Sequence, residues 1–183
     1  MRNVRIGGAL LALLALAGCS ASTESTEIGI RTVNVSLLGS RGVMEEIYPQ
    51  GGTYFFPRFA SQWDVFDVGL QNLEMLRESS QGDRVGDDSL RFKTIDGNDI
   101  SVNVTIAWRI DQSMAPYTLQ FVGSSTAEVE EKFVRPVSRT VVRDVLNQLK
   151  SEEYYQAQRR FQMAEEARAR LNAVMNSEGV SVE

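Results

Sequence analysis

The 183-residue sequence contains no histidine, a single cysteine and only four prolines. The absence of histidine removes the most common general base, the most common zinc ligand and the side chain that titrates near neutral pH. One cysteine cannot form an intrachain disulfide or a thiolate metal cluster. Catalytic sites of the Ser-His-Asp and Cys-His types are therefore excluded.

Positive charge is also scarce, because 24 acidic residues face 19 lysines and arginines, for a net charge of −5. Loss of residues 1–18 removes Arg2 and Arg5 and takes the net charge from −5 to −7. Such a chain repels phosphate backbones, so we expect no nucleic-acid partner. The sequence also lacks the common nucleotide-binding and zinc-protease motifs. We expect a protein that is not an enzyme and that holds no metal or cofactor.

Residues 1–18 are expected to be a signal peptide. Arg2 and Arg5 precede an apolar run at 6–17 that contains only Ile, Gly, Ala and Leu. The run is roughly 18 Å long as a helix, whereas a bilayer core needs about 20 apolar residues. It is therefore typical of a cleaved signal peptide and not of a permanent span.

The Leu-Ala-Gly-Cys ending at 16–19 resembles the bacterial lipobox. That resemblance implies cleavage between Gly18 and Cys19, diacylglycerol on the Cys19 thiol and acylation of the new amino terminus. Ser20 is similar to the signal that sorts Gram-negative lipoproteins to the outer membrane, facing the periplasm. The small polar residues of 19–27 are expected to form a flexible tether. The alternative is an ordinary signal peptide followed by a free Cys19.

Residues 28–111 are dominated by β-prone runs. Runs at 28–37, 43–48, 53–57 and 63–70 are separated by turns, and a polar loop occupies 77–89. The Asp96-Gly97 pair between two β-prone runs predicts a hairpin. After it, apolar residues alternate with polar ones over 100–111, which predicts a sheet with one covered face and Trp108 in the core.

Helices are expected to cover that sheet. Ser125 and Glu128 have the spacing of a capping box, and an apolar band follows at helical spacing over 129–149. Pro136 predicts a kink or short break near Arg135. We expect an α+β domain at 28–150, built from a mostly antiparallel sheet covered on one face by helices. Residues 151–183 are expected to begin a charged helical stalk with a short coiled-coil-like seam.

Four segments resemble the SPFH, or Band 7, family of stomatins, prohibitins and flotillins. These are the Gly-Gly-Thr-Tyr-Phe-Phe-Pro turn and strand at 51–57, the strand at 63–70, the Thr-x-Asp-Gly hairpin with its Val-rich strand at 92–104, and the helix at 135–154. The resemblance covers roughly 30–180 and implies an SPFH-like fold. Residues 179–183 are similar to the start of a further strand in the family.

The resemblance implies a membrane-tethered scaffold that self-assembles into a homo-oligomer and organises the membrane or regulates a partner, such as a membrane protease. A lipid anchor departs from the family, whose members are mostly held by an N-terminal hairpin or transmembrane helix. The alternative is a monomeric accessory lipoprotein of the cell envelope that binds a single protein partner.

Three sets of charged residues are candidate sites. Arg135, Arg139 and Arg143 recur at every fourth position, and like charges at that spacing repel unless acidic groups answer them. They are candidates for a contact with an adjacent subunit or anionic headgroups, against a solvated face beside Glu128 and Glu131. The two acidic sets are weaker, and solvent exposure is the better interpretation of both. They are Asp64 with Asp67 as paired carboxylates, and Asp83, Asp87 and Asp88 as calcium ligands.

Overall fold

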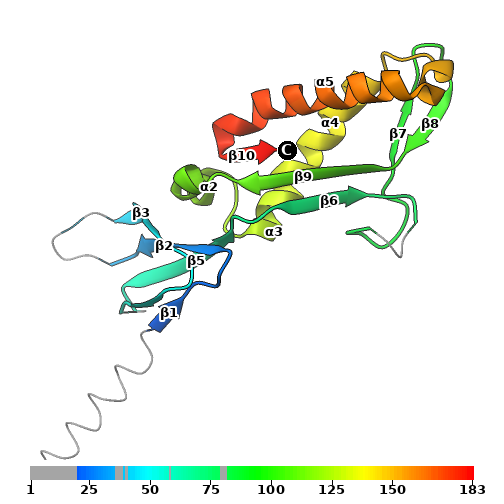
Figure 1. The fold of residues 1–183 in the computed structure, drawn as a ribbon. Coiled ribbons are helices and arrows are strands. Elements are labelled where there is room, and N and C mark those ends of the chain that lie inside the picture. The colour runs from blue at the N-terminus through cyan, green and yellow to red at the C-terminus, as the bar shows by residue number, and fades with distance from the viewer. Residues whose placement is uncertain (1–19, 36–38, 40, 58, 79–81) are drawn as a thin grey trace, which may run out of the picture. The chain divides into compact units, whose positions relative to one another are not determined.

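The computed structural model describes residues 20–35, 39, 41–57, 59–78 and 82–183 (Figure 1). The expected signal peptide, with Gly18 and Cys19, lies outside the described residues. The described chain divides into an N-terminal unit that ends at Asp67 and a C-terminal unit that begins at Val68. Each unit has its own sheet and its own buried core.

The N-terminal unit is built from antiparallel strands. β2 (Glu27–Val33) lies between β3 (Gly42–Tyr48) and β5 (Ser61–Asp67), and β1 (Ser20–Ser22) pairs separately with β4 (Thr53–Phe55). The side chains of Ile28, Ile30 and Phe66 are fully buried. Their burial on the central strand and its neighbour provides the hydrophobic stabilisation of this small unit.

The first strand differs from the expectation in its bounds. We expected one β-prone run over 28–37, but β2 ends at Val33 and Val35 is 54% exposed. Leu37 lies outside the described residues. The inward-facing positions begin earlier, at Ile28 and Ile30, where β2 pairs with strands on both sides.

The C-terminal unit contains a three-stranded antiparallel sheet in the order β10-β9-β6, formed by Val180–Val182, Val104–Ile110 and Gln71–Met75. A separate hairpin pairs β7 (Leu90–Lys93) with β8 (Asp99–Val102) across the predicted Asp96-Gly97 turn. The alternation predicted for 100–111 is confirmed, with Ile106, Trp108 and Ile110 buried. The run is nevertheless split at Asn103, so β8 and β9 belong to different sheets.

Helices pack on this unit as expected, with one addition. Ser125 caps α3 (Thr126–Val129) by accepting a hydrogen bond from the Glu128 backbone N–H, which confirms the predicted cap. A π-helical turn at Glu130–Val134 leads into α4 (Arg135–Leu146), so the irregularity predicted near Pro136 is present. The addition is α2 (Ala115–Phe121), whose signals are Pro116 in its first turn and Asp111 capping the 3-10 turn before it.

The C-terminal segment does not extend away from its unit. α5 (Ala157–Met175) runs along the sheet and α4 (Figure 1), and its Ala167, Leu171 and Met175 are buried. The strand expected near residue 180 is confirmed as β10, which pairs with β9. Within the described residues, the segment 151–183, expected to begin a stalk, therefore supplies part of the core of this unit.

The architecture is α+β with antiparallel sheets, as predicted from the sequence. In the described part of the chain, no helix combines the length and the apolar character needed to cross a bilayer.

Candidate functional site

The described part of the N-terminal unit opens with strand β1. Ser20 is the first residue of β1 and is the pairing partner of Phe55 in β4. Farther along, the Thr23 hydroxyl donates to the carbonyl oxygen of Pro49 at 2.8 Å and accepts from the backbone N–H of Gly52 at 3.1 Å. Residues 20–27, expected to be a flexible tether, instead contain β1 and the first residue of β2.

Four aromatic rings form one cluster in the same unit, made by Tyr48, Tyr54, Phe56 and Trp63. Their ring centroids lie 4.9–6.4 Å apart, within the range of favourable aromatic pairs. The Arg31 guanidinium carbon lies 4.7 Å from the centroid of Phe56, a cation–π arrangement. Burial raises the pKa of the Tyr48 hydroxyl, and its hydrogen bond to Glu46 acts in the same direction.

A glycine makes room for this cluster. A Cβ atom on Gly29 would lie 2.0 Å from the nearest ring carbon of Trp63, so the indole packs directly on the backbone of the central strand. We expect Gly29→Ala to destabilise the N-terminal unit by about 1–3 kcal/mol, because the indole must leave its place. Urea denaturation followed by Trp63 fluorescence measures this in a Trp108→Phe background. Gly29→Ala unfolding at the urea concentration of that background would contradict the packing described.

Two further aromatic side chains of this unit face solvent. Phe55 is 72% exposed on β4 and Phe59 is 85% exposed in the turn before β5. Both side chains are therefore available to contact an apolar surface. Phe55 is also the pairing partner of the residue next to Cys19.

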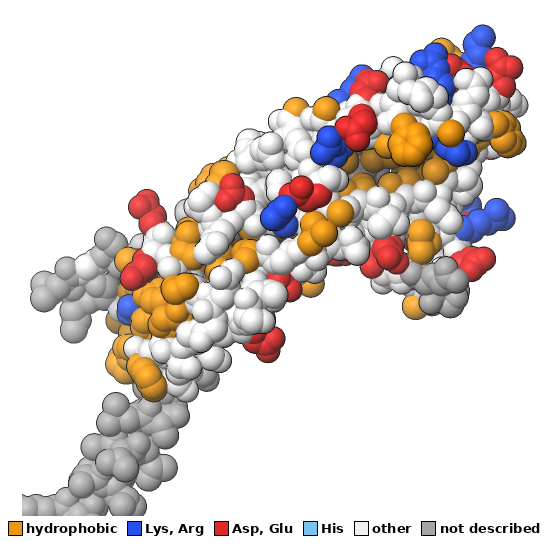
Figure 2. All heavy atoms as spheres, in the orientation of Figure 1, with side chains coloured by type: hydrophobic (Ala, Val, Ile, Leu, Met, Phe, Trp, Pro, Cys, Tyr) orange, Lys and Arg blue, Asp and Glu red, His pale blue; other side chains and the backbone are white. Residues whose placement is uncertain are grey.

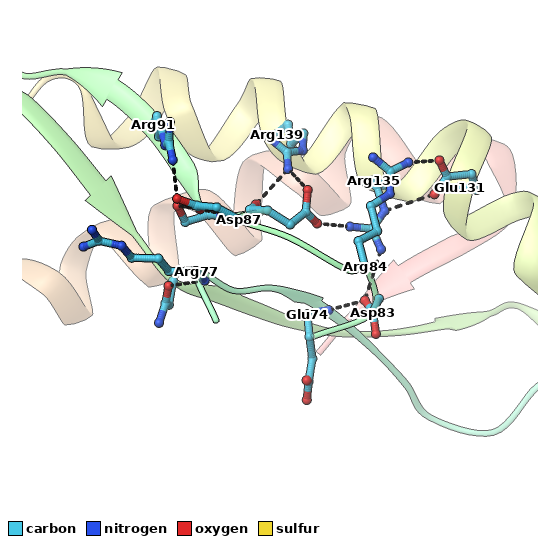
Figure 3. A network of polar contacts seen from close by, with 12 residues as sticks. Glu74, Arg77, Asp83, Arg84, Asp87, Arg91, Glu131, Arg135 and Arg139 are labelled. Atoms are coloured by element: carbon cyan, nitrogen blue, oxygen red, sulfur yellow. Dashed lines mark hydrogen bonds and ion pairs between the residues drawn. The ribbon is translucent and has the colours of Figure 1, made fainter. Parts of the chain in front are cut away.

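The C-terminal unit contains a buried cluster of charges centred on Arg135 (Figure 3). The Arg135 side chain is 4% exposed, and its guanidinium contacts four carboxylates. It lies 3.1 Å from Asp83, 3.4 Å from Glu130 and 3.2 Å from Glu131, and it donates a short hydrogen bond to Asp88.

Arg139 completes the cluster from the next turn of α4. Its guanidinium donates to the Asp88 carbonyl oxygen at 2.8 Å and also to the Asp88 carboxylate. Asp83 further accepts from the backbone N–H of Glu74 at 2.6 Å. The two arginines therefore fix the loop at 82–89 against the helix and the edge of β6.

The family-model comparison identifies the fold. The model described as "SPFH domain / Band 7 family" matches residues 21–183. The chain belongs to the SPFH / Band 7 family. Its members are typically membrane-associated scaffolds and are generally not enzymes. No curated protein sequence matches the chain.

The structure divides the arginine stripe that we expected from the sequence of this SPFH chain. Arg135 is buried and Arg139 is half-buried against the acidic loop of the same unit, whose carboxylates compensate their charge. Contact of the stripe with another subunit or with headgroups stays a prediction. Arg143, the third member of the stripe, is exposed. The sequence showed both halves of the cluster but gave no sign of their pairing, since 47 positions separate Asp88 from Arg135.

The candidate calcium ligands also pair with arginines of their own unit. Asp83 and Asp88 bind arginines, and Asp87 pairs with Arg91 and accepts from Ser89. Hydrogen bonds from Ser89 and Arg91 lower the pKa of Asp87 to about 2. Among the described residues, no group of His, Cys, Asp or Glu side chains could hold a metal ion. Asp64 and Asp67 lie an odd number of positions apart on β5, so their side chains point to opposite faces of the strand.

The raised pKa of Glu130 predicts that the stability of the C-terminal unit depends on pH. Burial raises the pKa of the Glu130 carboxyl, the charge of Asp83 adds to the effect, and Arg135 opposes it. A carboxyl with a raised folded pKa binds its proton more tightly in the folded state, so its ionisation costs stability as the pH rises through that pKa. We expect Glu130→Gln to gain stability relative to wild type between pH 4 and pH 7 (about the range over which such a group ionises). Urea midpoints at both pH values measure this, with Glu165→Gln on the exposed face of α5 as the control. A difference that shrinks with rising pH would contradict the assignment.

Proposed function

We propose that this chain is a lipid-anchored SPFH scaffold of the bacterial cell envelope, which self-assembles and organises the membrane or a membrane protein bound to it. The anchor is the thiol of Cys19, and the outer membrane facing the periplasm is the favoured site in a Gram-negative cell. The scaffold has no chemistry of its own. Its effect comes from many anchors and weak lateral contacts acting together, which raises the avidity of the array well above the affinity of one copy.

One observation carries the proposal, namely that the residue next to the proposed anchor already lies in a strand. Consecutive Cα atoms are about 3.8 Å apart, and Ser20 already pairs with Phe55. A lipidated Cys19 would therefore hold the N-terminal unit directly against the headgroups, with no long tether between them. The exposed rings of Phe55 and Phe59 then have an apolar boundary to enter, which accounts for their exposure.

Oxidative footprinting of the wild-type protein on vesicles tests this arrangement. We expect Phe55 and Phe59 to be labelled several-fold more slowly on vesicles than in a soluble Cys19→Ser protein. Tyr155 and Phe161, which are 88% and 71% exposed in the C-terminal unit, serve as internal references. Equal labelling of Phe55 and Phe59 in the two states would overturn direct docking of the N-terminal unit on the bilayer.

A further inference from the structure

A groove in the C-terminal unit runs between α5 and the strands β8 and β9. Its volume is about 390 Å³, within the range of ligand-binding sites. Val102, Val104 and Ile106 line it from the strands, and Met163 and Leu171 line it from the helix. Figure 2 shows hydrophobic side chains gathered in a hollow beneath α5.

The groove exists because α5 does not fill the space above the sheet. Its residues facing the groove include Ala164 and Ala167, whose side chains are a single methyl group. Phe161, the aromatic residue near the start of the helix, is 71% exposed and does not line the groove. Arg168 interrupts the apolar seam of the helix, lines the groove and pairs with Glu165 at 2.8 Å.

A second hollow continues from one end of the groove. This recess of about 670 Å³ shares four lining residues with it: Val102, Asn103, Tyr154 and Arg160. The Tyr154 hydroxyl donates to the Leu146 carbonyl oxygen, which fixes the ring at the junction. Burial raises the pKa of Tyr154 to about 12, with Glu153 adding to the effect, so the hydroxyl stays protonated at neutral pH.

The recess is cationic although the whole chain is acidic. Arg77 and Arg160 line it, and the Arg160 guanidinium donates to a neutral acceptor, the Tyr154 carbonyl oxygen, at 3.1 Å. Among the described residues, no carboxylate forms an ion pair with Arg160. The one acidic residue of the lining, Asp99, already pairs with Lys93 at 2.8 Å.

We propose that the groove and recess together bind a single-chain amphiphile with an anionic head, of the long-chain fatty acid class. The acyl chain lies along Val104, Ile106 and Leu171, and the carboxylate lies in the recess at Arg160 and Arg77. The order of surfaces supports this occupant, because an apolar trough leads directly into a positively charged end. Burial of the chain gives affinity, and charge-assisted hydrogen bonds to the head give direction.

Photo-crosslinking tests the site in the full lipidated chain. The protein is reconstituted in lipid nanodiscs and incubated with a palmitate analogue that carries a diazirine on its chain, and mass spectrometry then locates the adducts. We expect adducts on the segments 102–107 and 160–171. An analogue with the same chain and a trimethylammonium head is expected to label these segments roughly tenfold less, the ratio that corresponds to about 1.4 kcal/mol.

Variants of α5 separate the groove from general attraction to lipid. Ala164→Phe places a ring in the groove and is expected to abolish the adducts, whereas Ala169→Phe, at an exposed position outside the lining, is expected to keep them. Arg160→Gln should weaken labelling roughly tenfold, a loss typical of a charge-assisted hydrogen bond. Arg170→Gln is the matched control, because Arg170 pairs with Glu166 outside the groove.

Two results would overturn the proposal. The first is labelling of 102–107 and 160–171 that is equal in Ala164→Phe and Ala169→Phe. The second is an absence of labelling in wild type together with a fall in oligomer mass for Ala164→Phe alone, which would make a second copy of the chain the occupant.

Discussion

Arg135→Met is expected to destabilise the C-terminal unit by about 3–5 kcal/mol, because removing one partner of a buried ion pair leaves the other charge uncompensated. The Asp88 side chain is 9% exposed and would retain only Arg139 as a counter-ion, while Asp83 and Glu130 would lose their contact with Arg135. Urea denaturation of a Trp63→Phe background, followed by the fluorescence of the buried Trp108, reports on this unit alone.

Arg143→Met is the matched control, because Arg143 is exposed two turns farther along the same helix. Its effect is expected to stay within about 0.5 kcal/mol. Adding Asp88→Leu to Arg135→Met should restore part of the loss, since it removes a buried carboxylate that Arg139 alone then compensates. If Arg135→Met and Arg143→Met have equal effects, the cluster does not fix the loop at 82–89 to the helix.

Cys19→Ser is expected to move the protein from the washed membrane fraction to the soluble fraction. Each buried methylene of an acyl chain contributes about 0.8 kcal/mol, and more than one chain is needed for stable anchoring. The mass of the intact wild-type protein should exceed that of its polypeptide from residue 19 by the mass of a diacylglycerol and a further acyl group. The variant should lack this added mass.

Ser22→Ala provides the control, because it changes an exposed side chain of β1 without touching the anchor residue. It should remain in the membrane fraction with its lipid mass intact. A Cys19→Ser protein that still sediments with the membrane after washing would show that some other part of the chain holds it there.

Several elements of the fold were predictable from local sequence signals. The alternation from Ile100 to Ile110 correctly predicted the inward face of β9, because the side-chain period of a strand is fixed at two. The Asp96-Gly97 turn and the Ser125 cap were likewise predictable from local backbone chemistry. The glycine at 97 has a φ of +82°, a left-handed conformation that favours this residue.

Long-range pairing was not predictable from those signals. The sequence places Arg135 in a stripe of arginines that repeats at every fourth position. Only the tertiary structure brings Asp83 and Asp88 into contact with it. The π-helical turn before Arg135 contributes, because it shifts the register of the helix and so changes which side chains face inward.

The C-terminal helix shows the same limit. Its charge pairs at 165–168 and 166–170 have the spacing at which side chains of a helix meet, a local feature of the sequence. Its docking partner could not be read from periodicity, because an apolar seam does not specify whether it meets its own sheet or another chain. Leu171 and Met175 are buried in the same unit. A variant that lacks 151–183 would therefore lose part of its core, and its oligomeric state would not report on self-assembly alone.

The mass of the lipidated protein, extracted in detergent and measured by size-exclusion chromatography with light scattering, tests the scaffold most directly. We predict a large, discrete oligomer whose mass, after subtraction of detergent, is a whole multiple of that of one lipidated chain. A monomer that persists at high protein concentration would contradict self-assembly and leave an accessory lipoprotein with a single protein partner.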